Sequence, residues 1–264
     1  AAGCPVVFKA HSGHMATAGW VADAIIRAAE RTDMPAGVFN MIYGGGVGEW
    51  LVKHPAIQAV GFTGSLKGGN ALSHMAATRP QPIPVFAEMS SINPVFLLPE
   101  ALAVRGEQIA AQLAGSVTLG CGQFCTNPGL VIGLRSPQFS AFVETFCASM
   151  NQQPPQTMLN AGALDSYSKG LGELHEHPGL THLAGKPQQG SQAQPQVFQA
   201  DVSLLLKGDE LLQEEVFGPT TIIVEVEDRA QLTAALQGLR GQLTATLIGE
   251  ADELLEYRWL AESL

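Results

Sequence analysis

The first ninety residues repeat one pattern of a short apolar run, a loop and a segment with helical spacing. Apolar runs at residues 5–8, 38–42, 59–63 and 83–89 predict four buried strands. Apolar positions at helical spacing predict a helix over residues 15–29, a short helix ending near His54, and another from Ser65 to about Ala77. This order of elements predicts an α/β domain with a parallel sheet.

The ends of these predicted strands carry residues suited to ligand binding. In open parallel α/β sheets, ligands lie beyond the carboxyl ends of the strands. The residues at these ends are Lys9, Gly44, Thr63, Gly64, Ser65 and Glu88. Their shared position favours a functional role for the group.

The pattern changes near residue 90, where we place a domain boundary. The elements expected beyond it are strands at residues 95–98, 130–132, 220–226 and 243–248 and helices at residues 102–119, 139–150, 230–239 and 251–264. We expect a cofactor-binding domain over residues 1–89 and a catalytic domain over residues 90–264. The chain starts without Met and ends inside an apparent helix, which predicts a piece of a longer protein with segments missing from both domains.

Composition and charge exclude several classes of function. With 14 Lys and Arg against 24 Asp and Glu, the net charge of −10 disfavours nucleic acid and anionic lipid as partners. The sequence contains no run of about 18 uncharged apolar residues, so no membrane span is predicted. The 4 cysteines lack metal or disulfide spacing, which indicates reduced thiols in a cytoplasmic protein.

Cys125 is the candidate nucleophile. It lies between glycines and a Thr-Asn-Pro-Gly sequence, where a helical segment gives way to a tight turn. A thiolate at such a turn can attack a carbonyl carbon, and nearby backbone N–H groups can stabilise the resulting oxyanion. Taken alone, Cys125 fits a structural cysteine better, and Cys121 fits a small packed side chain.

Two glycine-rich turns are candidate phosphate sites. Residues 44–48 do not match the dinucleotide fingerprint, because Glu49 stands where its third glycine would fall, and a flexible turn is equally consistent. Residues 61–65 join a strand to a helix, whose N-terminal N–H groups and dipole suit a pyrophosphate. The alternative at this turn is a simple helix cap formed by Ser65.

The remaining candidates are carboxylates and histidines. Glu88 at the end of a strand fits either a general base acting on water or a surface residue in a turn. Either Glu214 or Glu215 could bind ribose hydroxyls, although a solvated acidic turn is the commoner case. His175 and His177 have no third ligand at a useful spacing, so we expect no metal. A cysteine hydrolase would need a partner histidine for Cys125, and no feature assigns one.

Five motifs in a characteristic order resemble the aldehyde dehydrogenase superfamily along nearly the whole chain. They are Val7-Phe8-Lys9, Gly61-Phe62-Thr63-Gly64-Ser65, Glu88, Gly122-Gln123-Phe124-Cys125-Thr126 and Glu214-Glu215-Val216-Phe217-Gly218-Pro219. The resemblance implies a Rossmann-like cofactor sheet followed by an α/β catalytic domain. It also implies an oxidoreductase that converts an aldehyde to a carboxylic acid, working in the full-length protein as a homo-oligomer.

The resemblance implies a role for each matching residue. Cys125 would be the nucleophile that forms a thiohemiacetal and then a thioester, and Glu88 would activate the water that hydrolyses the thioester. The implied contacts of the NAD(P) cofactor are Lys9, Ser12, Gly44, Gly48, Gly64, Ser65, Gly69, Met89, Glu215 and Phe217. An Asn of the oxyanion hole would belong to a segment preceding residue 1.

Departures from the family pattern refine the expected cofactor and substrate. The usual Gly-Gly after the base is Ser90-Ser91, the usual Thr after Ser65 is Leu66, and the usual acidic residue three positions after Lys9 is Ser12. Because position 12 carries no carboxylate, the 2′-phosphate on the adenosine ribose of NADP would not be repelled there. The sequence therefore predicts NADP as the cofactor, with NAD as the alternative.

Three segments look like the branch that oxidises 2-oxoglutarate semialdehyde (2,5-dioxovalerate). They are residues 9–11, 88–94 and 123–129. A similar branch oxidises fatty aldehydes with NADP and is the alternative within the same chemistry. A catalytically incomplete fragment and a cysteine hydrolase are the alternatives outside it.

Overall fold

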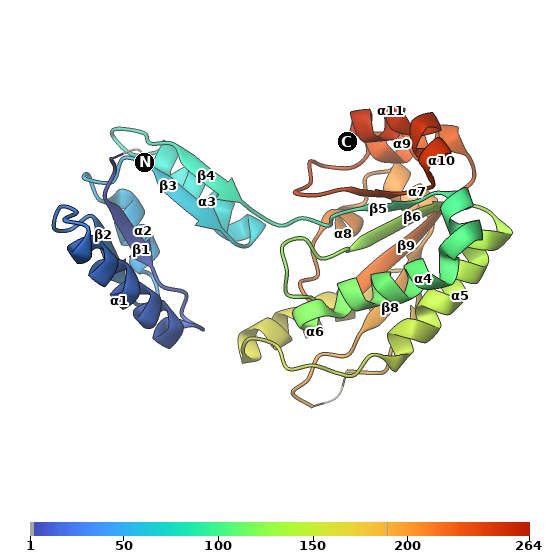
Figure 1. Cartoon of the computed structure of the whole chain (residues 1–264), viewed down its shortest axis with the longest axis horizontal. Coiled ribbons are helices and arrows are strands. Elements are labelled where there is room, and N and C mark those ends of the chain that lie inside the picture. Colours follow the sequence, from blue (N-terminus) through green and yellow to red (C-terminus); the bar gives the residue numbers. More distant parts are fainter. Residues whose placement is uncertain (1–2, 189) are drawn as a thin grey trace. The chain divides into compact units, whose positions relative to one another are not determined.

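The computed structural model describes residues 3–188 and 190–264. The chain divides into two compact units, Ala1–Met89 and Ser90–Leu264. The helices and strands of both units are labelled in Figure 1. Within the described residues, no helix is both long and apolar enough to cross a lipid bilayer.

In its described residues, 3–89, the first unit contains four short parallel strands and three helices. Strand β1 (Val6–Lys9) pairs with β2 (Phe39–Ile42) across helix α1 (Met15–Arg31), and β3 (Val60–Thr63) pairs with β4 (Val85–Glu88) across α3 (Leu66–Ala77). Helix α2 (Val47–Lys53) connects the two pairs. The strands therefore form two separate parallel pairs, whereas the sequence pattern predicted one sheet. The apolar pattern indicates where strands lie but not which strands pair, because a strand at the edge of a sheet can be as apolar as one in its centre.

A small core and one arginine join the elements of this unit. Val52, Ala76 and Ile83 are buried together. The Nη1 atom of Arg79 donates to the carbonyl oxygens of Val52 at 3.0 Å and Ile57 at 2.9 Å. The end of α2 is thereby fixed to the segment that follows α3.

The second unit is built on a six-stranded sheet. Its strands in spatial order are β10 (Thr246–Ile248), β5 (Val95–Leu97), β6 (Leu130–Leu134), β9 (Thr220–Val226), β8 (Gln196–Ala200) and β7 (Leu180–Ala184). All neighbours are parallel except β7, which runs antiparallel to β8 at one edge. The parallel pairs agree with the predicted α/β class.

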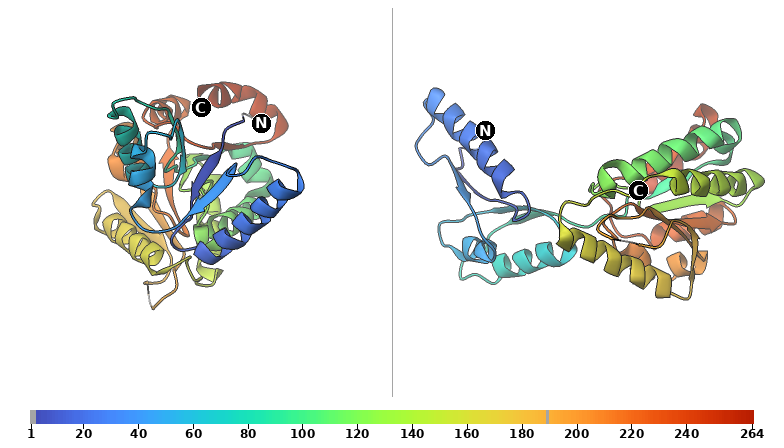
Figure 2. Two further views of the ribbon diagram at one scale, coloured as in Figure 1. Left: turned by 90° about the vertical axis from the view of Figure 1, so that its left-hand side faces the viewer. Right: turned by 90° about the horizontal axis from the view of Figure 1, so that it is seen from below.

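Helices cover both faces of this sheet. Helices α4 (Pro99–Thr118) and α5 (Pro137–Gln152) lie side by side on one face, with α6 (Ala161–Glu176) on the other, as Figures 1 and 2 show. The short helices α7 (Val202–Leu206), α8 (Glu210–Gln213), α9 (Arg229–Gln237) and α11 (Arg258–Ser263) add apolar side chains to the α6 face. Strand β6 serves both layers because Leu130 and Ile132 face α6 while Val131 faces α4 and α5.

Aromatic side chains fill the layer beneath α5. This helix begins at Pro137 after Ser136, whose hydroxyl accepts the N–H of Phe139 at 3.0 Å. The rings of Phe139, Phe142 and Phe146 stack in series and are fully buried. Each such ring stabilises the fold by about 1.5–3 kcal/mol relative to an exposed one.

Several elements differ from the predicted ones. Helix α6 and strands β7 and β8 were not predicted, because the Gly-rich and Gln-rich sequence around them hides the apolar periodicity. His175 and Glu176 are the last two residues of α6. The single helix expected at the end of the chain is two, α10 (Ala251–Glu256) and α11, which meet at Tyr257.

Candidate active site

The loop that carries Cys125 begins with three consecutive left-handed residues. Helix α4 ends at Thr118, and a 3-10 turn, η1 (Leu119–Gly122), follows it. Within this turn Gly120, Cys121 and Gly122 have φ values of 55°, 61° and 64°. The backbone therefore reverses sharply at the end of the helix and leaves Cys125 exposed three residues later. The two glycines make this path accessible, because a Cβ atom disfavours left-handed backbone.

The two cysteines of the loop have different environments. Cys121 is 1% exposed, and burial raises the pKa of its thiol. Its thiol is thus less reactive than an ordinary one, and it packs as the small side chain expected from the sequence. The exposed Cys125 is the thiol of this loop that a substrate can reach.

Two glutamine side chains fasten the loop to the segment that follows α5. The Gln156 amide accepts the N–H of Cys121 at 3.0 Å and donates to the carbonyl of Thr118 at 2.9 Å. The Gln123 amide oxygen accepts the N–H of Leu159 at 2.9 Å. Backbone groups that a helix end would leave unpaired are satisfied by these side chains, so the loop is held in one conformation.

The loop also touches the turn that follows the paired glutamates. Gly122 approaches the backbone of Gly218 so closely that any side chain at Gly122 would collide with it. The Nδ2 atom of Asn127 donates to the Gly218 carbonyl at 3.1 Å. Gly218 in turn leaves room for the ring of Tyr167 on α6. Two motifs about ninety residues apart in sequence thus form one surface.

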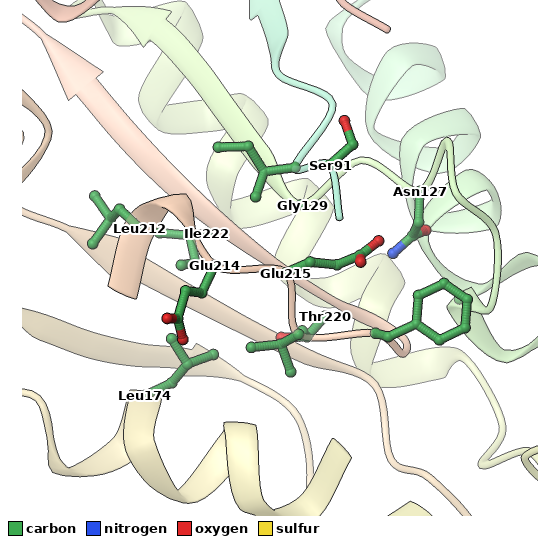
Figure 3. Close-up of a pocket in the computed structure, with 13 residues that line it drawn as sticks. Ser91, Asn127, Gly129, Leu174, Leu212, Glu214, Glu215, Thr220 and Ile222 are labelled. Carbon is green, nitrogen blue, oxygen red and sulfur yellow. The ribbon is translucent and has the colours of Figure 1, made fainter. Parts of the chain in front are cut away.

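A small pocket lies between these motifs. Its volume is about 20 Å³, room for about one water molecule. The residues lining it include Ser91, Asn127, Glu214, Glu215 and Phe217. In Figure 3 the Glu215 carboxylate points toward Asn127, whereas Glu214 points away toward Leu174. Of the two glutamates, Glu215 is therefore the one directed at the cysteine loop.

Glu88 occupies the predicted end of strand β4. Its backbone pairs with Thr63, and its carbonyl accepts the N–H of Gly64 at 3.1 Å. Among the described residues, none supplies a hydrogen bond to the buried Oε1 atom of Glu88. A buried carboxylate oxygen usually has a donor, so this atom is positioned to accept one from water.

The predicted cofactor residues of the first unit gather at strand ends. Lys9 ends β1, and the next N–H, from Ala10, bonds to the carbonyl of Ile42 at the end of β2. Ser65 caps α3 by accepting the N–H of Gly68 at 3.2 Å. The helix cap and the phosphate site are compatible, because the N–H groups of the first turn still point beyond the helix.

Five other predicted cofactor residues also belong to the first unit. Gly44, with a φ of +125°, lies in the turn before α2, and Gly48 lies in the first turn of that helix. Ser12 is exposed in the loop after β1. Gly69 lies against Met89, since a side chain at Gly69 would meet the Met89 thioether. Cys125, Glu215 and Phe217 belong to the second unit, and the other predicted site residues belong to the first.

Two of the histidines, His175 and His182, pack against each other. The rings of His175 and His182 have centroids 4.9 Å apart, and both contact Phe198. Burial, followed by the neighbouring His182, lowers the pKa of His175. In the part of the chain that the structure describes, no group of three or more His, Cys, Asp or Glu side chains is arranged to hold a metal ion.

The sequence did not reveal that Asn93 holds the cysteine loop. Asn93 is 3% exposed, has a φ of 44° and bonds to the backbone of the cysteine loop. The signals in the sequence were its place in the 88–94 segment that resembles the semialdehyde branch and its position before Pro94, which suggests a turn.

Comparison with known proteins settles the family. The sequence matches the family described as "Aldehyde dehydrogenase family" over residues 1–257. The chain belongs to the aldehyde dehydrogenase family. This membership confirms the predicted superfamily and, with the parallel sheets, the predicted fold class.

Two curated relatives have similar names. The chain is 53% identical over 266 residues to the alpha-ketoglutaric semialdehyde dehydrogenase of Acinetobacter baylyi, covering 100% of this chain and 51% of that protein. It is 47% identical over 257 residues to alpha-ketoglutaric semialdehyde dehydrogenase 2 of Azospirillum brasilense, covering 96% of this chain and 49% of that protein. The chain thus spans about half the length of the curated relatives it matches.

Solved structures share the fold at lower identity. An NAD-dependent benzaldehyde dehydrogenase from Corynebacterium glutamicum superposes with a TM-score of 0.81 at 23% identity, covering 98% of this chain and 56% of that one. The glyceraldehyde-3-phosphate dehydrogenase GapN of Methanocaldococcus jannaschii, complexed with NADP, gives a TM-score of 0.79 at 19% identity, covering 98% and 56%. At these identities the likeness extends to the fold alone.

Proposed function

We propose that the whole protein oxidises 2-oxoglutarate semialdehyde to 2-oxoglutarate, with NADP as the electron acceptor. The observation that carries the chemistry is the exposed Cys125 on a loop fixed through Cys121, Gln123 and Asn127. The substrate follows from the names of the relatives that are 53% and 47% identical. Their shared name favours this semialdehyde over the fatty aldehydes that the sequence left open.

In the proposed reaction, the Cys125 sulfur attacks the aldehyde carbon and forms a thiohemiacetal. The carbonyl oxygen becomes an oxyanion, which the Cys125 backbone N–H can stabilise because the loop backbone is already fixed. Loss of hydride from the former aldehyde carbon leaves a thioester on Cys125. Hydrolysis of this thioester releases the carboxylic acid and restores the thiol.

Glu88 is the proposed base for the hydrolysis step. Its buried Oε1 atom, which lacks a donor within the described residues, can accept a proton from the water that attacks the thioester. Glu215, whose carboxylate points toward Asn127 of the cysteine loop in Figure 3, is the proposed ligand of the ribose next to the nicotinamide, together with Phe217.

The residues present fit a dinucleotide. The glycines of the two turns leave backbone exposed, and the capped N-terminus of α3 offers N–H groups to a phosphate. Lys9 would bind the adenosine ribose, Ser12 the group on its 2′ position, and Gly44, Gly48, Gly64, Ser65, Gly69 and Met89 the adenine and pyrophosphate region. When bound, NADP supplies the hydride acceptor.

Turnover of a panel of aldehydes tests the substrate. With NADP, we expect kcat/KM for 2-oxoglutarate semialdehyde to exceed that for a long-chain fatty aldehyde by at least about 100-fold, since a site built for a polar substrate discriminates strongly. Absorbance at 340 nm reports each reaction in the whole protein. Equal or better turnover of the fatty aldehyde would replace the proposed substrate, and hydrolysis of esters without any oxidation would replace the proposed class of reaction.

Cofactor preference should depend on Ser12. We expect kcat/KM with NADP to exceed that with NAD, and Ser12→Glu to shift the ratio toward NAD by about 10–100-fold, because a carboxylate repels the 2′-phosphate and accepts from the 2′-hydroxyl. Ser12→Gln is the matched control, since it adds the same bulk without charge. A wild-type protein with a strong NAD preference contradicts the proposal.

A further inference from the structure

The buried Asn93 side chain joins Ser91, the cysteine loop and Thr244 through hydrogen bonds. It lies five residues after Glu88 in sequence and belongs to the second unit. Its φ of 44° is left-handed, a conformation that asparagine tolerates better than most residues do. A buried asparagine with this backbone indicates that its amide is needed where it lies.

The nitrogen end of the Asn93 amide holds the cysteine loop. Its Nδ2 atom donates to the carbonyl oxygen of Cys125 at 2.9 Å and to that of Asn127 at 2.9 Å. These two carbonyls flank Thr126, and the Nδ2 atom also lies 3.4 Å from the Ser91 carbonyl, the longest of its three hydrogen bonds. The orientation of the Cys125 peptide is thereby fixed.

The oxygen end of the same amide is held by three donors. Its Oδ1 atom accepts from the Ser91 hydroxyl at 2.9 Å, the Thr244 hydroxyl at 2.8 Å and the Thr244 N–H at 3.3 Å. Donors on one side and carbonyls on the other leave one orientation for the amide group. The side chain that clamps the loop is therefore itself immobile.

Ser91 and Gln242 extend this support. The Gln242 amide oxygen accepts the N–H of Ile92 at 2.6 Å and that of Asn93 at 3.3 Å, and the Ser91 hydroxyl accepts the N–H of Leu243 at 2.9 Å. Ser91 replaces the second glycine that usually follows the base in the resemblance described above. The departure thus has a structural use, because a glycine would have no hydroxyl to offer.

We propose that Asn93 is a positioning residue for the Cys125 nucleophile. The inference rests on the proposed function, in which the Cys125 sulfur and backbone N–H must face one aldehyde carbon and its oxygen. The clamp on the Cys125 carbonyl fixes the backbone on which both groups depend. An aspartate has the same shape and tolerates the same φ, but its carboxylate would face two carbonyl oxygens without a proton to donate.

The test compares Asn93→Asp and Asn93→Gly in the whole protein. Glycine removes the hydrogen bonds to the Cys125 and Asn127 carbonyls and adopts the left-handed backbone without strain. Aspartate replaces those hydrogen bonds by repulsion between its carboxylate and the two carbonyl oxygens. We expect kcat for semialdehyde oxidation to fall at least about tenfold for Asn93→Gly and about 100-fold for Asn93→Asp, with the KM for NADP within about twofold. Ser136→Ala, which removes a helix cap on α5, is the control for a general loss of stability and should keep kcat within about twofold.

Alkylation of the cysteines separates positioning from mere folding. Iodoacetamide at high pH, read out by peptide mass spectrometry, should label Cys125 of Asn93→Gly within about threefold of the wild-type rate, because this small reagent needs no oriented attack. The buried Cys121 should stay protected in the same sample. Undiminished kcat, or a loss of kcat that parallels labelling of Cys121, overturns the inference. A wild-type protein that does not oxidise any aldehyde overturns the proposed function instead.

Discussion

Replacing Cys125 by Ser is expected to lower kcat for aldehyde oxidation by at least about 1,000-fold in the whole protein, because a serine hydroxyl has no base assigned to activate it. Stopped-flow absorbance at 340 nm would measure both the first turnover and the steady state. The first turnover should disappear together with the steady state, since the thiohemiacetal precedes loss of hydride.

The matched control for this change is the other cysteine of the loop. Cys121→Ala removes a buried sulfur and keeps the backbone N–H that Gln156 accepts, so turnover should stay within a few-fold of wild type. Cofactor affinity, measured by fluorescence titration, should be unchanged by Cys125→Ser. A Cys125→Ser protein that still oxidises the aldehyde would contradict the assignment of the nucleophile.

The first unit was predictable from sequence because its elements are regular and local. Strand β4 ends at Glu88, helix α3 runs Leu66–Ala77 behind its Ser65 cap, and α2 ends just before His54, as the apolar spacing predicted. Helix capping and apolar periodicity depend on residues only a few positions apart, so both can be read from a single sequence. The prediction of one sheet was wrong, because β2 and β3 do not pair. Whether two strands pair depends on which strand edges meet in space, and the local sequence pattern does not contain that information.

The candidate site was predictable only in part, for the same physical reason. The cysteine loop and the paired glutamates could be found as motifs, but the contact of Gly122 with Gly218 joins segments about ninety residues apart. Helix α6, which carries the Tyr167 ring beneath Gly218, was not predicted at all. The partners of Asn93 reach about 150 residues along the chain to Gln242 and Thr244, a distance over which no local pattern operates.

Replacing Glu88 by Gln should have the second largest effect, and its effect should fall on a single step. The amide keeps the shape of the side chain but cannot take a proton from water, so we expect steady-state kcat to fall by about 100- to 10,000-fold. Formation of the thioester does not use this base. A burst of about one equivalent of reduced cofactor per subunit should therefore remain at 340 nm, followed by a nearly flat line.

The burst is what distinguishes a deacylation base from a residue that merely supports the fold. A misfolded variant loses the burst and the steady state together, and a base that activates Cys125 would also abolish the burst, because no thioester would form. Glu30→Gln is the matched control, since it makes the same chemical change on an exposed position of α1 and should leave both phases as in wild type. Trapped thioester on Cys125, found by mass spectrometry of quenched Glu88→Gln protein, would locate the block at hydrolysis, whereas unmodified Cys125 would assign Glu88 to an earlier step.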